Sequence, residues 1–192
     1  MIEDIRYRGK KIEIDQAGET VILHELIFYQ LNPAIGDEID LSKAVFDSQI
    51  EFAFEQAANY VVSRLKSSQQ VKLYLQKKGF SKEVAQVALD RLIDNRLIDD
   101  QEYARIYIES FSGERGHRYL KQKLRERGIT DYNLPQEDPE VVCAILEKRW
   151  GNSGKMELKQ RQKAQNFLLG RGFSFETIKK ALEMYENKSN DD

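Results

Sequence analysis

The chain has 192 residues and a net charge of −2; 32% of its residues are charged and three are proline, a composition typical of a soluble helical protein of one or two domains. No apolar run approaches the length of a membrane span and residues 1–4 lack the apolar core of a signal peptide, so we expect no membrane partner. Cys143 is the one cysteine, which excludes an internal disulfide and favours the reducing cytoplasm.

Residues 1–40 are expected to form an acidic leader that contains strands. Residues 1–56 hold five basic and twelve acidic residues, a balance of −7, whereas the remainder holds 25 basic and 20 acidic residues, a balance of +5. Lys11–Asp15 alternates in polarity, residues 16–19 have turn composition, and Val21–Leu23 is apolar and β-branched at two positions. These patterns predict a hairpin or a three-stranded cap, with a third strand near Leu26–Leu31.

A long helix is predicted from Ser42 toward Leu65, because apolar residues recur there at helical spacing. These residues are Val45, Phe46, Ile50, Phe54, Ala57, Val61 and Leu65. Residues 41–66 then connect the leader to three helical repeats, which we expect over residues 57–99, 100–151 and 152–187. Residues 188–192 are polar and are predicted to be a frayed tail.

The repeats are identified by a helix ending that occurs three times. A leucine, three further residues, a glycine and an apolar residue recur with the glycines at Gly79, Gly128 and Gly172, which are 49 and 44 residues apart. A glycine at this place adopts the left-handed conformation that ends a helix. Ser81 and Ser174 follow two of the glycines and are predicted to cap the next helix. The pattern predicts a mainly helical fold of three tandem three-helix repeats, in which residues 130–139 are an inserted acidic loop.

The spacing of the candidate catalytic and metal-binding residues does not match any motif for catalysis or metal binding. Asp99 and Asp100 are adjacent, so they do not face one another on a helix, and we interpret them as structural: one of them caps the helix that contains Tyr103, at a corner about one helix after Gly79. His24 begins a zinc-protease-like pair with the next glutamate, but the second histidine of that motif is absent. His117 and Cys143 show no ligand spacing. We therefore predict no enzyme activity, no metal and no cofactor.

Three motifs in a fixed order provide the most specific signal in the chain. They are Lys78-Gly79-Phe80, then Leu97-Ile98-Asp99-Asp100-Gln101-Glu102-Tyr103-Ala104, and then the basic segment Gly116–Ile129, which ends in Gly-Ile. Together they resemble the RecX family, bacterial proteins that regulate the RecA recombinase, over about residues 57–186. Residues 64–70 carry fewer charges than the family pattern, and the acidic insert at residues 130–139 is a second departure.

The resemblance implies a fold, a partner and a function. It implies three-helix repeats in a curved right-handed array, in a cytoplasmic and usually monomeric protein. It also implies binding along the groove of a RecA filament on single-stranded DNA, which damps strand exchange, ATP hydrolysis and co-protease activity in homologous recombination, DNA repair and the SOS response. Weak binding to naked DNA, the role of the acidic leader, and the choice between capping, disassembly and groove blocking stay open.

Seven basic residues are the candidate contacts with a filament or with DNA. They are Arg115, Arg118, Lys121, Arg125, Lys159, Lys163 and Arg171. The first four recur at three- and four-residue steps, so they share a face of the helix that leads to Gly128. Such a row could follow a phosphate backbone with salt-sensitive affinity, or meet acidic side chains of a protein filament. Basic residues near a helix C-terminus are also ordinary partners of the helix dipole.

An alternative function is a stand-alone helix-turn-helix-like DNA-binding regulator. It would use one corner to place a recognition helix in duplex DNA, and it predicts sequence-specific binding by a two-fold dimer. The helix that begins after Ser81 has few base-reading side chains at its start, which disfavours this role.

Overall fold

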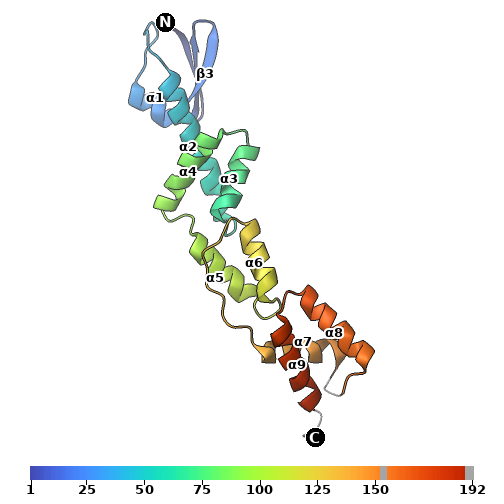
Figure 1. Cartoon of the computed structure of the whole chain (residues 1–192). Helices are drawn as coiled ribbons and strands as arrows, with labels where there is room; N and C mark the ends of the chain where they lie inside the picture. Colours follow the sequence, from blue (N-terminus) through green and yellow to red (C-terminus); the bar gives the residue numbers. More distant parts are fainter. Residues whose placement is uncertain (152–154, 189–192) are drawn as a thin grey trace. The chain divides into compact units, whose positions relative to one another are not determined.

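The computed structural model describes residues 1–151 and 155–188, and apart from Lys188 the expected tail at residues 188–192 lies outside that range. The chain divides into two compact units, Met1–Asp99 and Asp100–Asp192. The described residues form three strands and nine α-helices in the order shown in Figure 1. The prediction of a mainly helical chain with a small β-rich leader is therefore confirmed. None of the helices in the described ranges is both long enough and apolar enough to cross a bilayer.

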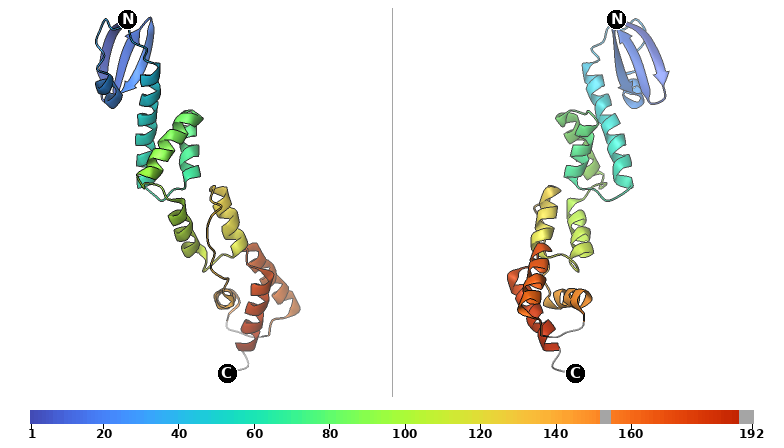
Figure 2. Two further views of the ribbon diagram at one scale, coloured as in Figure 1. Left: turned by 60° about the vertical axis from the view of Figure 1, so that its left-hand side comes forward. Right: turned by 90° about the vertical axis from the view of Figure 1, so that its right-hand side faces the viewer.

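The leader is an antiparallel sheet with strand order β1-β2-β3. The strands are β1 (Ile2–Arg8), β2 (Lys11–Gln16) and β3 (Glu19–His24). The predicted hairpin is β2–β3, and its turn contains Ala17 and Gly18 with φ angles of 52° and 77°. In both views of Figure 2 the sheet lies along the first part of α2 (Ser42–Val62).

The prediction of a third strand near Leu26–Leu31 is wrong, because that segment is the helix α1 (Glu25–Leu31). The third strand of the sheet is β1. His24 begins the helix, since its Nδ1 accepts a hydrogen bond from the backbone N–H of Leu26 at 3.2 Å. Asn32 ends the helix in the left-handed conformation, with φ of 48°. The segment Leu26–Leu31 is apolar apart from Gln30, and a run of this length fits a short strand as well as a short helix, so capping contacts decide between them.

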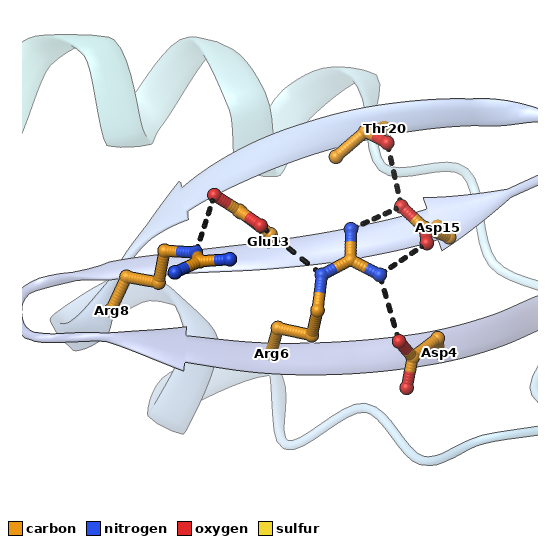
Figure 3. A network of polar contacts seen from close by, with 6 residues as sticks. All are labelled: Asp4, Arg6, Arg8, Glu13, Asp15 and Thr20. Carbon is orange, nitrogen blue, oxygen red and sulfur yellow. Dashed lines mark hydrogen bonds and ion pairs between the residues drawn. The ribbon is translucent and has the colours of Figure 1, made fainter.

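The two faces of the sheet differ in polarity. Ile12, Ile14 and Leu23 point to the face that packs on the helices and are fully buried. Arg6 of β1 lies on the opposite face and binds carboxylates of β1 and β2, and Thr20 of β3 joins the network by donating a hydrogen bond to Asp15 (Figure 3). Its guanidinium contacts carboxylate oxygens of Asp4 at 2.8 Å, Asp15 at 2.6 Å and Glu13 at 3.2 Å, and it lowers the pKa values of Asp15 and Glu13. Part of the leader's negative charge is thereby neutralised within the sheet.

The first unit continues with a helical repeat built from α2, α3 (Ser68–Lys77) and α4 (Lys82–Asp94). The long helix ends at Val62, so Leu65 lies outside it and is 45% exposed. The fully buried residues where α2 meets α3 and α4 are Ala53 and Ala57, whereas Phe54 and other large apolar residues of the predicted stripe are half-buried. Small side chains let the helices approach closely, and the larger ones flank the contact.

The second unit contains the remaining five helices. They are α5 (Asp100–Phe111), α6 (His117–Glu126), α7 (Pro139–Trp150), α8 (Leu158–Gly170) and α9 (Phe175–Asn187). Residues 130–138 form the loop predicted from their composition, and Tyr132 and Leu134 pack on the apolar cluster of α5 and α6. The helices α7, α8 and α9 share a second core that contains Leu146, Leu168 and the buried Cys143.

The three glycine corners have one geometry. Gly79, Gly128 and Gly172 have φ angles of 94°, 76° and 91°. In the first corner Phe80 N donates to Leu75 O at 3.2 Å while Gly79 N donates to Gln76 O at 3.0 Å, and the other two corners repeat both bonds. This paired pattern satisfies the last carbonyls of each helix. Ser81 and Ser174 then accept hydrogen bonds from the backbone of α4 and α9 at 3.1 Å, so both predicted caps are confirmed.

A fourth corner follows α4 without a glycine. Leu97 N donates to Leu92 O at 2.9 Å and Arg96 N donates to Ile93 O at 2.8 Å, which reproduces the pattern of the glycine corners. Arg96 occupies the left-handed position with φ of 56°. An arginine there carries a Cβ that crowds the following carbonyl oxygen, so this corner is strained where the other three are relaxed.

Candidate functional site

The helix α6 presents a row of cations on its exposed side. Arg118, Lys121 and Arg125 are exposed, while Leu120 and Leu124 of the same helix are buried in the second unit. In residues 1–151 and 155–188 none of these three cations lies within 4 Å of a carboxylate, although many other cations of the second unit are paired. A charge that is not neutralised within the chain can attract phosphate or an acidic surface.

The candidate cations near the third corner are tied to the backbone. Arg118 Nη2 donates to the carbonyl of Leu169 at 2.7 Å, and Arg171 Nη1 donates to the carbonyl of Glu114 at 3.1 Å. Arg115 stacks over the ring of Tyr119, with its Cζ 4.7 Å from the ring centroid. These contacts fix the positions of the three guanidinium groups while leaving their charges without a carboxylate partner in the described residues.

Lys159 and Lys163 form a separate group on α8. Both are exposed and lie four residues apart, so they share a face of the helix. Lys163 precedes Arg171 by eight residues, or about 12 Å along a helix. The seven predicted contact residues therefore lie in one unit but not at one spot.

A close backbone contact joins the start of α6 to the third corner. Gly116 N donates to the carbonyl of Arg171 at 3.1 Å, and Arg118 N donates to the carbonyl of Gly172 at 3.0 Å. A Cβ on Gly116 would lie 2.2 Å from Phe173 N, so no larger residue fits without a shift of the backbone. Gly116 has φ of −83°, which any residue can adopt. A glycine is required here because the backbone of the third corner leaves no room for a side chain, and not because of its φ angle. The sequence analysis assigned Gly116 no role of its own.

Glu137, in the acidic loop, holds the starts of two helices. Its Oε1 accepts a hydrogen bond from His117 N at 2.7 Å, at the start of α6. Its Oε2 accepts from Ser174 N and from Thr177 Oγ1, both at 2.9 Å, at the start of α9. Burial raises the pKa of this carboxyl, but the backbone and hydroxyl donors outweigh burial and the net pKa is lowered. The insert thus positions the basic helix α6, a role that the sequence did not indicate.

The corner residues and the acidic pair show no sign of chemistry. The three glycines shape turns, as their positive φ angles require. The helix α5 begins at Asp100, so Asp99 directly precedes it, in the position predicted for a cap. No cluster of three or more His, Cys, Asp or Glu side chains that could hold a metal occurs within the described part of the chain.

Two segments of the chain match known domain families. Residues 53–92 match the first three-helix domain of RecX, and residues 136–182 match the third three-helix domain of RecX. The second match contains α7, α8 and most of α9.

Proteins called regulatory protein RecX are similar over most of this chain. The protein of Bacillus cytotoxicus is 25% identical over 166 residues, which cover 81% of this chain and 62% of the relative. The protein of Halalkalibacterium halodurans is 28% identical over 157 residues, with 76% and 59% covered. That of Bacillus subtilis strain 168 is 27% identical over 168 residues, with 81% and 63% covered. The chain thus spans about 60% of the length of these relatives.

Two crystal structures have a similar fold. A structure of regulatory protein RecX aligns with a TM-score of 0.67 and 21% identity, covering 95% of this chain and 98% of the other. The structure of RecX from Lactobacillus salivarius aligns with a TM-score of 0.60 and 21% identity, covering 71% and 96%. At this identity the likeness establishes the fold.

Proposed function

We propose that this chain regulates RecA by binding the RecA filament on single-stranded DNA, because its three ordered motifs resemble the RecX pattern, two of its segments match RecX domains, and its relatives are RecX regulatory proteins. The observation that carries the proposal is the presence of two RecX three-helix domains on one helical repeat fold. In this proposal the protein is non-enzymatic, needs no cofactor, and acts as a cytoplasmic monomer that damps strand exchange, ATP hydrolysis and co-protease activity.

The charge distribution supports a nucleoprotein partner. Residues 1–56 have a balance of −7 and the remainder has a balance of +5, so the helical repeats present a basic surface to a polyanion. The candidate contacts are led by Arg115, Arg118, Lys121 and Arg125, followed by Lys159, Lys163 and Arg171. A repeat frame suits a filament, because repeated units offer contacts at regular intervals to repeated protomers.

The experiment that tests the proposal is a titration of the single-stranded-DNA-dependent ATPase of RecA with this protein. Inhibition, together with co-sedimentation of the protein with the filament, is the expected result. Inhibition at substoichiometric ratios would favour capping or disassembly, and inhibition near saturation would favour blocking of the groove. Full ATPase activity with excess protein that stays in the supernatant would refute the proposal.

The same purified protein can be used to distinguish the proposed function from the alternative function. A stand-alone duplex-binding regulator should elute as a dimer and protect a defined DNA sequence, with no effect on RecA. A monomeric mass with binding to filaments of any DNA sequence is what our proposal expects.

A further inference from the structure

A cavity of about 600 Å³ lies between α7, α8 and the turn that contains Gly113 and Glu114, and the proposed row of cations on α6 does not account for it. Its charged lining residues are the cations Lys148, Arg149 and Arg171 and one carboxylate, Glu114, and its apolar and aromatic lining includes Val141, Ile145 and Phe167. The volume falls in the range of sites for small organic ligands, about 300–1,000 Å³. The cavity thus combines positive charge at one part of its wall with apolar surface at another.

The aromatic wall of the cavity is covered by cations. The guanidinium carbons of Arg149 and Arg171 lie 4.3 Å and 4.7 Å from the centroid of the Phe167 ring. Trp150 meets the same ring edge-on, with centroids 5.5 Å apart. Lys148 and Arg149 are exposed and have no carboxylate within 4 Å in the described ranges. These planar groups present stacking surfaces beside unneutralised charge.

A cation–aromatic contact recurs at the matching place of the first repeat. Tyr60 and Tyr74 stack with centroids 4.1 Å apart and planes within 4° of parallel. Lys66 lies 4.7 Å from the Tyr60 centroid and Lys78 lies 5.6 Å from the Tyr74 centroid. Lys78 immediately precedes Gly79, just as Arg171 immediately precedes Gly172, and each cation faces the aromatic residue four positions earlier.

The middle repeat has a cation–aromatic contact at the same place, but its aromatic ring comes from a different helix. Arg127 immediately precedes Gly128, and its Cζ lies 4.7 Å from the centroid of Tyr107. The aromatic partner comes from α5, because the position four residues before Arg127 is Lys123. One cation over an aromatic ring therefore occurs at each glycine corner. Folding alone requires the glycine at these corners but does not require an aromatic ring under the preceding cation.

From the cavity and this recurrence we propose that the third domain binds one nucleotide of single-stranded DNA between α7 and α8. Lys148 and Arg149 hold the phosphate, and the base enters the apolar part beside Ile145 and stacks on the guanidinium planes over Phe167. Single strands are bound in this way without sequence preference, by cations along the backbone and flat groups against the bases. An acidic side chain would satisfy the cations but leave the apolar wall empty. The inference rests on the proposed function for its choice of DNA.

The test uses the full chain and a fluorescein-labelled oligothymidylate in fluorescence anisotropy titrations at low salt. We expect Lys148→Gln with Arg149→Gln to weaken binding about tenfold, which is the scale of one stacked base or a few phosphate contacts. Lys148→Gln alone removes charge without touching the Phe167 stack and should weaken binding about two- to fourfold. Lys179→Gln on α9 removes an exposed cation that lies outside the cavity and 4.0 Å from the carboxylate of Glu183, and it should leave affinity unchanged.

A photo-cross-link locates the base directly. An oligonucleotide that carries 4-thiothymidine should cross-link to peptides containing Trp150 or Phe167, and the double variant should not form this product. Unchanged affinity in the double variant, cross-links confined to α6, or no binding of the oligonucleotide by the unmodified chain would each overturn the inference.

Co-sedimentation with the RecA filament separates the two proposals. If the cavity variants no longer bind the filament but bind the free oligonucleotide normally, the cavity takes a protein side chain; the nucleotide inference fails and the proposed function stands. If the unmodified chain binds and cross-links the oligonucleotide but ignores the filament, the proposed function fails and the nucleotide site stands.

Discussion

The carboxylate of Glu137 accepts a 2.7 Å hydrogen bond from the backbone N–H of His117, and through this bond an inserted loop fixes the start of the basic helix. The other carboxylate oxygen binds the start of α9, so one side chain serves two helix N-termini. Negative charge is favoured at both places by the helix dipoles. The acidic loop at residues 130–138 is therefore part of the frame that positions Arg118.

Replacing Glu137 with glutamine should destabilise the second unit by about 1–3 kcal/mol, because a neutral amide accepts these bonds more weakly and offers only one acceptor oxygen. Urea unfolding followed by the fluorescence of Trp150, the single tryptophan, measures the destabilisation. Glu176→Gln is the control, since Glu176 also lies in the first turn of α9 but is exposed and forms an ion pair with Lys180 four residues along the same helix. Equal effects of the two substitutions would contradict the dual role of Glu137.

The same carboxylate should make stability depend on pH. The folded state lowers the pKa of Glu137 below its ordinary value of 4.5, so the unfolded chain binds the proton more tightly. The contribution of Glu137 is then present above pH 4.5 and is lost as the pH falls through the folded pKa. The difference in unfolding free energy between the unmodified chain and Glu137→Gln should be constant from about pH 7 to about pH 5.5 and shrink below about pH 4.5. A difference in unfolding free energy that grows on acidification would show that folding raises the pKa of Glu137 and does not lower it.

Gly116→Ala should destabilise the second unit by about 2–3 kcal/mol, because the new methyl group would lie 2.2 Å from Phe173 N and would force apart the backbone pairs that join α6 to the third corner. Gly113→Ala provides a matched control three residues away, since a Cβ on Gly113 meets no atom within 4 Å. Tryptophan fluorescence in urea compares the two variants. Destabilisation of the control alone, or an equal effect in both, would argue against the close approach at Gly116.

The sequence predicted what depends on neighbours along the chain. The conformations of Gly79, Gly128 and Gly172 and the caps at Ser81 and Ser174 follow from local hydrogen bonds, and all of them are found. The β2–β3 hairpin is found for the same reason. The helix at Leu26–Leu31 was missed because a short, mainly apolar run does not distinguish a helix from a strand, and its N-terminal cap is His24, which is not one of the preferred capping residues.

The candidate site was predictable only in part. The exposure of Arg118, Lys121 and Arg125 follows from their spacing against Leu120 and Leu124. The roles of Glu137 and Gly116 depend on contacts with residues far along the chain. Nothing in the sequence distinguishes Glu137 from the other acids of its loop, and the ordinary φ of Gly116 leaves no local signature. The cation–aromatic contacts at the first and third glycine corners join residues four positions apart, so their spacing is present in the sequence, whereas the contact of Arg127 with Tyr107 joins two helices.

Arg96→Gly should stabilise the first unit by about 0.5–1 kcal/mol. The glycine removes the Cβ strain of a left-handed residue, which costs about 1–2 kcal/mol, and part of this gain is offset by the greater freedom of glycine in the unfolded chain. Far-ultraviolet circular dichroism in urea follows the gain, and the Trp150 transition of the second unit should not move. Arg96→Ala keeps the Cβ and should give no gain. If alanine stabilises as much as glycine, the arginine side chain and not its backbone conformation is the source of strain.

Charge reversal on α6 distinguishes phosphate contacts from protein contacts. Lys121 and Arg125 are exposed and make no ion pair within the described residues, so Lys121→Glu with Arg125→Glu should keep the fold and weaken filament binding about tenfold or more. Arg118→Glu is a less clean test, because it also removes the 2.7 Å bond to Leu169 and should lower stability. Lys179→Glu on α9 is the control for a general charge effect.

The salt dependence of this binding then identifies the partner surface. If the two residues bind phosphate, the reversal should reduce the slope of log affinity against log salt by about 0.7 for each phosphate that the variant no longer binds on single-stranded DNA, and affinity for a free oligonucleotide should fall in parallel. If they meet acidic side chains of the protein filament, filament binding should fall while affinity for the oligonucleotide is unchanged. Filament affinity equal to that of the unmodified chain would remove this row from the interface and leave two basic candidates, the pair Lys159 and Lys163 on α8 and the cavity between α7 and α8.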